Sequence, residues 1–187
     1  MTTLEIIGTL FALLGVWLTT QQRIWCWPVA IIAIVIYIYI FFKSKLYGDS
    51  ALQVFYLAMS FYGWYEWLYG GKEHTELTLS KIDLKMLIIT TAAGVGGTFV
   101  LVYFLKMTDS NVPWLDACTT SFSLVATWMM ARKILENWLY WIIIDLLYVG
   151  IYIYKDLYVT GLQYFIFTIL AAYGYWQWRK ELKLQTS

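Results

Sequence analysis

Seven apolar segments, each close to the length that crosses a lipid bilayer, follow one another along the 187-residue chain. A helix needs about 20 mainly apolar residues to span the hydrocarbon core. Only 13% of the residues are charged, whereas soluble domains carry about 25%. We therefore predict an all-α, polytopic membrane protein in which residues 1–187 form one transmembrane domain. The seven predicted spans are residues 4–20, 25–42, 51–69, 84–105, 113–131, 137–154 and 159–178.

The distribution of basic residues predicts the orientation of these spans. Cytoplasmic loops carry an excess of Lys and Arg. Four basic residues fall on the side of the N-terminus, namely Lys43, Lys45, Lys106 and Lys155. Nine fall on the other side: Arg23, Lys72, Lys81, Lys85, Arg132, Lys133, Arg179, Lys180 and Lys183. The N-terminus is therefore expected outside the cell and the C-terminus in the cytoplasm.

An internal repeat predicts the architecture. The stretch "FYGWYEW" (61–67) returns as "AYGYWQW" (172–178), which places Gly63 and Trp67 111 positions before Gly174 and Trp178. The same shift relates Trp17 to Trp128, Trp27 to Trp138, and Tyr37 to Tyr148. Residues 4–69 and 113–179 are thus interpreted as two copies joined by a linker helix, 84–105. Because a single helix separates them, both copies would enter the membrane from the same side, a three-one-three parallel repeat like that of SWEET sugar transporters.

One face of the sixth predicted helix combines aromatic rings with a carboxylate. In "NWLYWIIID" (137–145), Trp138, Trp141 and Asp145, followed by Tyr148, recur at spacings of three and four, which share a helix face. Asp145 lies about 12 Å deeper than Asn137 at 1.5 Å per residue. Intramembrane carboxylates cost about 2.5–3.5 kcal/mol and usually face a cavity or a partner. Two rings beside an acid suit a flat cationic ligand; the alternative is a structural hydrogen bond to a neighbouring helix.

Other polar groups at membrane depth are candidates for the same site. Gln53 and Gln163 occupy matching places near the outer ends of the third and seventh helices, and Thr120 lies on a polar stripe of the fifth. Glu66 is also a candidate, although it lies close enough to the membrane surface to reach water. Hydroxyls such as Thr120 often only bond the helix backbone. We assign Trp25, Trp176 and Trp178 to an interfacial aromatic belt.

The same sequence argues against catalysis and against nucleic-acid binding. The single histidine, His74, lies in a loop, and no cluster of metal-ligating residues accompanies it. "GVGG" (94–97) lacks the Lys and Ser/Thr of a phosphate loop and is expected to allow close helix packing. The net charge of +1 gives no basic patch for nucleic acid. We predict a passive transporter without cofactor or metal; a membrane enzyme and a receptor or scaffold subunit are the alternatives.

The motif "W-x-x-W-x-x-x-D", preceded by "EN", resembles that of the PnuC family of bacterial vitamin transporters. The resemblance covers nearly the whole chain and implies facilitated diffusion across the inner membrane, followed by trapping of the vitamin by a cytoplasmic kinase. It places Trp138, Trp141 and Asp145 in the ligand site, with Asn137 beside them. Members take up nicotinamide riboside, thiamine, riboflavin or deoxynucleosides. The acidic motif and Glu66 favour thiamine as the cargo, with nicotinamide riboside as the alternative, and the oligomeric state is left open.

Overall fold

The structure, a computed structural model, describes residues 3–45, 47–107, 113–154, 156 and 158–185. Lys155, which was counted in the orientation argument, lies outside this set. Within it the chain forms seven α-helices and one short 3-10 helix, η1 (Lys72–His74). The helices are α1 (Thr3–Thr20), α2 (Cys26–Lys43), α3 (Tyr47–Tyr69), α4 (Leu84–Leu105), α5 (Pro113–Ala131), α6 (Asn137–Tyr154) and α7 (Tyr158–Gln185).

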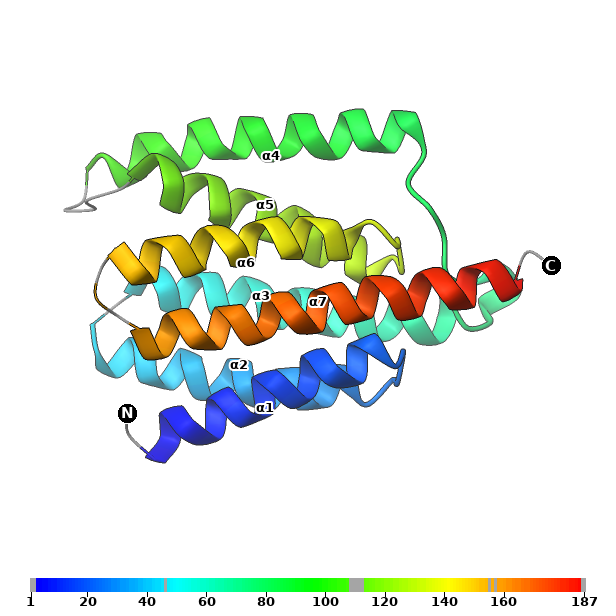
Figure 1. Cartoon of the computed structure of the whole chain (residues 1–187), viewed down its shortest axis with the longest axis horizontal. Coiled ribbons are helices and arrows are strands. Elements are labelled where there is room, and N and C mark those ends of the chain that lie inside the picture. The colour runs from blue at the N-terminus through cyan, green and yellow to red at the C-terminus, as the bar shows by residue number, and fades with distance from the viewer. Residues whose placement is uncertain (1–2, 46, 108–112, 155, 157, 186–187) are drawn as a thin grey trace.

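Each of the seven predicted segments corresponds to one of these helices. Among the described residues, four helices are long and apolar enough to cross a membrane, namely α1, α2, α4 and α6. The others, α3, α5 and α7, have 23, 19 and 28 residues, but their amides, hydroxyls and charges make them less apolar. Successive helices run in alternating directions, so that α1 begins at one end of the bundle and α7 ends at the other (Figure 1).

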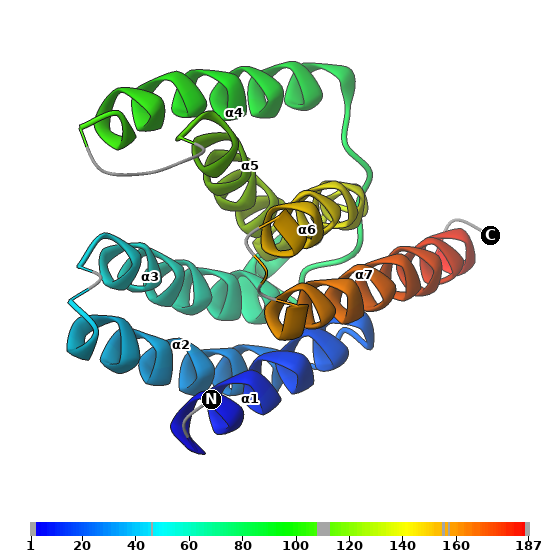
Figure 2. The same cartoon turned by 60° about the vertical axis from the view of Figure 1, so that its left-hand side comes forward.

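The helices pack as two groups of three. In the N-terminal group α1 packs on α2 and α2 on α3, while in the C-terminal group α5 packs on α6 and α6 on α7. The most extensive contacts between the groups are those of α1 with α7 and of α3 with α5. Each contact therefore pairs the first helix of one group with the last helix of the other. The remaining helix, α4, packs on α5 at the edge of the bundle (Figure 2).

Small residues bring α4 close to α5, as the "GVGG" motif predicts. A Cβ at Gly94 would lie 2.5 Å from the Phe122 ring, and Ser121 Oγ donates a 2.8 Å hydrogen bond to the Gly94 carbonyl. The opposite face of α4 exposes large apolar side chains, among them Leu84, Ile88, Phe99 and Tyr103. A row of this kind is stable in contact with lipid.

The turns within the two groups have the same backbone conformation. Gln22 after α1 and Lys133 after α5 both adopt positive φ, at 52° and 49°. Lys45 after α2 and Asp156 after α6 do the same, at 60° and 56°. Each pair is separated by 111 residues, the shift found in the sequence. Positive φ is uncommon for residues other than glycine, so its recurrence at matching positions indicates that both groups turn in the same way.

Four tryptophans form the centre of a buried cluster at the end of the bundle where α3 and α7 finish. Trp27 meets Trp67 edge to face at 5.4 Å and 87°, and Trp138 meets Trp178 at 5.3 Å and 86°. Trp67 and Trp178 then contact each other across the two groups, with ring centroids 6.1 Å apart. Beneath each outer ring lies a glycine, Gly63 under Trp27 and Gly174 under Trp138. We call these four residues the tryptophan cluster.

One assignment to the interfacial belt is wrong. Trp178 is 0% exposed and lies inside the tryptophan cluster, because the face of α7 that carries it packs against Trp138 and Trp67. Trp25 and Trp176 are well exposed on the bundle surface, in keeping with their assignment to the belt. The sequence does not distinguish the two kinds of tryptophan, since all three lie on the same predicted side of the membrane, Trp25 just before α2 and the other two in the C-terminal half of α7.

Candidate functional site

The centre of the candidate site is Asp145, which lies halfway along α6 and is 5% exposed. Among the described residues no hydrogen bond or ion pair reaches its carboxylate. Burying an unpaired carboxylate is costly, and such groups in membrane proteins mark binding sites and pathways by default. No contact within the described part of the fold therefore explains why a carboxylate is buried at Asp145 in α6.

The two tryptophans of the motif occupy different surroundings. Trp138 is 2% exposed, and its ring lies against Gly174, where an added Cβ would come within 2.7 Å. Its Nε1 is buried without a partner within the described residues. Trp141, one turn closer to Asp145, is half-buried and packs on the margin of the tryptophan cluster. Trp138 is thus part of the core, whereas Trp141 lies between the core and the acid.

Three tyrosine rings pack together on the other side of Asp145. Tyr148 and Tyr152 extend from α6 and meet Tyr164 of α7, with ring centroids 4.7 and 5.3 Å from it. Tyr152 lies seven residues beyond Asp145, just as Trp138 lies seven residues before it. At 1.5 Å per residue Trp138 and Tyr152 lie about 10 Å from the acid along the helix, and Trp141 and Tyr148 lie closer to it. Asp145 is therefore enclosed between a layer of tryptophans and a layer of tyrosines.

Hydroxyl groups from α3 and α5 border the tyrosine layer. The Tyr56 hydroxyl of α3 lies near Ser123 of α5, and the Tyr148 hydroxyl lies near Thr119 and Thr120. Ser123 also donates to the backbone of its own helix at 2.7 Å, which is the structural role expected for such hydroxyls. Thr120 is the one predicted residue of α5, and the structure brings it to Tyr148.

The amide side chains are less clearly placed. Asn137 is fully buried at the start of α6, where its Nδ2 donates 2.7 Å to the Ile134 carbonyl and its Oδ1 has no partner among the described residues. It thus serves the turn before α6. Gln53 and Gln163 are half-buried on α3 and α7, and within the described part of the chain no hydrogen bond joins either of them to α6.

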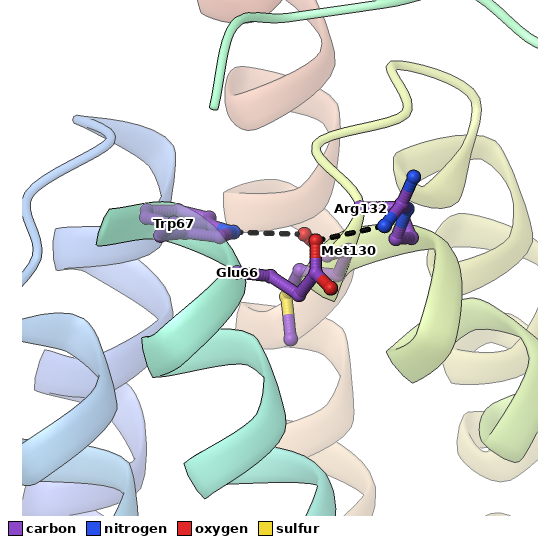
Figure 3. Close-up of polar contacts among 4 residues, drawn as sticks. All are labelled: Glu66, Trp67, Met130 and Arg132. Carbon is purple, nitrogen blue, oxygen red and sulfur yellow. Dashed lines mark hydrogen bonds and ion pairs between the residues drawn. The ribbon is translucent and has the colours of Figure 1, made fainter. Parts of the chain in front are cut away.

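Glu66 is engaged elsewhere. Its Oε2 accepts a 2.7 Å ion-paired hydrogen bond from Arg132 Nη1, in the turn between α5 and α6 (Figure 3). The Glu66 side chain is 13% exposed and that of Arg132 is 41% exposed. The pair lies beside the tryptophan cluster, away from the middle of α6. Arg132 is therefore a partner that sequence reasoning missed, because it counted this residue only toward orientation.

The repeat separates residues that serve the fold from residues that do not. Thr9 and Tyr37, the counterparts of Thr120 and Tyr148, share a 2.9 Å hydrogen bond in the N-terminal group, and Trp27, the counterpart of Trp138, has the same packing. These residues occur in both groups, so common packing explains them. The counterparts of Trp141 and Asp145 are Ala30 and Ile34. A single ligand site requires only one set of binding residues, whereas packing residues recur in both groups. Residues that occur in only one group are therefore the best candidates to bind a ligand.

Other residues of the site were not predicted. The tyrosine layer depends on Tyr164 and Tyr56, which lie on α7 and α3, and only the approach of these helices to α6 reveals them. The sequence identifies each of them only as a large aromatic residue on the polar side of an otherwise apolar helix. No group of three or more His, Cys, Asp or Glu side chains able to hold a metal occurs among the described residues.

Comparison with known proteins finds relatives over nearly the whole chain. A family model described as "Nicotinamide mononucleotide transporter" matches residues 2–180. The nicotinamide riboside transporter PnuC of Escherichia coli is 28% identical over 201 aligned residues, which cover 94% of this chain and 84% of the relative. The riboflavin/roseoflavin transporter RibM of Streptomyces davaonensis is 25% identical over 181 residues, with 93% and 83% covered.

A solved structure described as "Crystal structure of the Vitamin B3 transporter PnuC" has the same fold. It superposes with a TM-score of 0.77 at 26% sequence identity and covers 96% of this chain and 82% of that chain. The similarity therefore includes all seven helices and is not confined to the α6 motif.

Proposed function

The chain belongs to the PnuC family of vitamin transporters, and we propose that it carries nicotinamide riboside across the cell membrane by facilitated diffusion. The observation that supports this cargo is the buried, unpaired carboxylate of Asp145 with aromatic layers on either side. The nicotinamide ring of the riboside is flat and cationic, so it can stack on Trp141 while its charge is balanced by Asp145. A cytoplasmic kinase would then trap the cargo by phosphorylation.

Nicotinamide riboside replaces the thiamine that the sequence favoured. The relatives are named for nicotinamide riboside and for riboflavin, and none of those compared is named for thiamine. One of the two arguments for thiamine has also lost its force, because Glu66 is paired with Arg132 and is not free to meet a cargo. Asp145 disfavours riboflavin, whose ring is uncharged. Thiamine is the useful competitor in any test, since it is also a flat cation.

For the membrane arrangement we retain seven spans in a three-one-three parallel repeat, with repeats at 4–69 and 113–179 and α4 as the linker. Three features support it: the matching turns, the matching tryptophan pairs and the exchange of first and last helices in the contacts between the groups. The cargo would lie between the two groups at the depth of Asp145. The basic residues favour an external N-terminus and a cytoplasmic C-terminus.

The decisive experiment measures binding to the purified protein by calorimetry. Nicotinamide riboside should bind more tightly than thiamine or riboflavin. Asp145→Asn keeps the shape of the side chain and removes its charge, and should weaken nicotinamide riboside binding by at least about 30-fold, the loss typical of a buried charge left unpaired. It should affect riboflavin much less. Glu73→Gln, which removes an exposed loop carboxylate, is the matched control and should change neither affinity.

Uptake into liposomes then tests the class of transport. Labelled nicotinamide riboside should equilibrate across the membrane without ATP or an ion gradient. Uptake that requires a proton or sodium gradient would exclude facilitated diffusion. Preference for thiamine would overturn the cargo, and failure of all three vitamins to bind would overturn the function.

A further inference from the structure

We propose that a reciprocal pair of tryptophan hydrogen bonds, locked by the Glu66–Arg132 ion pair, is the gate that closes the cytoplasmic end of the cargo path. The proposal rests on the proposed function, because a gate requires a transported cargo. The contacts that define the gate do not depend on which molecule is carried. We call the two hydrogen bonds the tryptophan clasp: Trp67 Nε1 to the Met130 carbonyl, and Trp178 Nε1 to the Thr19 carbonyl.

The clasp joins the two helix groups twice in the same manner. Trp67 of α3 donates a 3.2 Å hydrogen bond to the Met130 carbonyl in the last turn of α5, as Figure 3 shows. Trp178 of α7 donates a 3.1 Å hydrogen bond to the Thr19 carbonyl in the last turn of α1. Met130 and Thr19 are 111 residues apart, as are the two tryptophans. Each group therefore holds the other through the last helix of one and the first helix of its partner.

Further contacts strengthen one of the two connections. Beside Trp67, Glu66 binds Arg132 at 2.7 Å, and the Lys133 ammonium lies 4.6 Å from the centre of the Trp67 ring. At the matching positions of the other connection the sequence has Gln177, Gln21 and Gln22, of which Gln22 donates a hydrogen bond to Glu181. At these three matching positions the Trp67 side has charged residues and the Trp178 side has amides. Glu66→Gln would remove the ion pair and give the first connection the amide that Gln177 supplies to the second, while Arg132 and Lys133 keep their charges.

The position of the clasp makes it a barrier that a cargo must pass. The α3 and α5 helices come closest where both of them end, which is the end that holds the clasp (Figure 2). The tryptophan cluster fills the space between the groups there, and Trp67 and Trp178 are its central, almost fully buried members. A molecule bound at the depth of Asp145 can leave in this direction only after the groups separate. Separation breaks both indole hydrogen bonds, the ion pair and the contact between Trp67 and Trp178.

The chain contains a native reporter of this opening. Cys26 is 2% exposed and packs within the same cluster, next to Trp27, so a thiol reagent reaches it only when the clasp opens. The second cysteine, Cys118, is more exposed and is removed as Cys118→Ser. Labelling of Cys26 by a small maleimide in purified protein then measures opening without any cargo. Vitamin binding therefore tests the proposed function, and Cys26 labelling tests the gate, so that failure of one can be distinguished from failure of the other.

Three variants should accelerate the labelling of Cys26. Glu66→Gln removes the ion pair and should raise the rate about two- to fivefold, because a partly exposed pair contributes at most about 1 kcal/mol. Trp67→Phe and Trp178→Phe remove one indole N–H each and should raise it about three- to tenfold. The two tryptophan variants should act to a similar extent, because the clasp is reciprocal. Lys180→Gln, which removes an exposed positive charge at the same end of the bundle, is the control and should leave the rate unchanged.

A second reporter distinguishes local opening from general loosening. Ala33 is 4% exposed in the middle of α2, and Ala33→Cys in a Cys26→Ser, Cys118→Ser background places a buried thiol away from the clasp. The gate predicts faster labelling at Cys26 and an unchanged rate at Ala33→Cys. Equal acceleration at both sites would mean that the variants loosen the whole bundle, which would overturn the proposal. Unchanged labelling of Cys26 in all three variants would overturn it as well.

Discussion

Replacing Trp138 and Trp141 one at a time should separate stability from binding. Trp138 is almost fully buried, lies against Gly174 and meets Trp178 edge to face. Trp141 is half-buried and lies one turn closer to Asp145. We expect Trp138→Ala to destabilise the protein, and Trp141→Ala to weaken cargo binding with a smaller effect on stability.

The magnitudes follow from burial. Truncating a fully buried tryptophan costs about 3–5 kcal/mol, which at about 2–4 °C per kcal/mol for a chain of this size lowers the melting temperature by about 6–20 °C. Trp27→Ala should cost the same, because Trp27 is 3% exposed and has the same edge-to-face geometry with Trp67. Trp141→Ala should lose about 1–3 kcal/mol of stacking on the cargo, or about one to two decades in Kd.

The assay combines thermal unfolding in detergent, followed by tryptophan fluorescence, with calorimetric titration of nicotinamide riboside below the melting temperature. Trp27→Ala is the matched control, since it removes the same packing from the group in which Ile34 stands at the position of Asp145. The reasoning would be refuted if Trp138→Ala kept its melting temperature and lost affinity. It would also be refuted if Trp141→Ala bound the cargo like the unaltered protein.

Two further predictions concern charge and orientation. Burial lowers the pKa of Lys133 below its usual 10.5, while Glu76, Glu181 and Cys26 act in the opposite direction. The folded protein therefore loses the Lys133 proton more readily than the unfolded chain does. Raising the pH through the lowered pKa toward about 10 should stabilise the protein relative to Lys133→Met. A melting temperature that falls relative to that of Lys133→Met over this pH range would contradict the prediction. For orientation, Glu73→Cys in a Cys118→Ser background should react with a membrane-impermeant thiol reagent only after cells are opened, and Ser44→Cys at the opposite end should react in intact cells. The reverse pattern would invert the topology.

Much of the fold could be predicted because it depends on local rules. The lengths of the apolar runs gave all seven helices, and the polar breaks gave their ends to within a few residues, except where α3 begins earlier and α7 continues to Gln185. The shift of 111 residues found in the sequence also relates the turn positions with positive φ and the two edge-to-face tryptophan pairs in the structure. The candidate site was predicted in part. Asp145 stood out because a carboxylate is rare at that depth, whereas Tyr164 looked like any aromatic residue of an apolar helix.

The number of helices, their order and the position of the acid on α6 can be predicted from the sequence alone, because hydrophobicity and residue spacing are properties of the chain itself. Which aromatic residues belong to the core and which border the acid depends on contacts between helices that are distant in the sequence. Trp138 and Trp141 are equivalent in the motif, yet the approach of α7 buries one on Gly174 and leaves the other half-buried. The same contacts gave Glu66 a partner in Arg132, 66 residues away. Pairing between distant segments depends on how the two helix groups pack against each other, and local sequence patterns do not predict that packing.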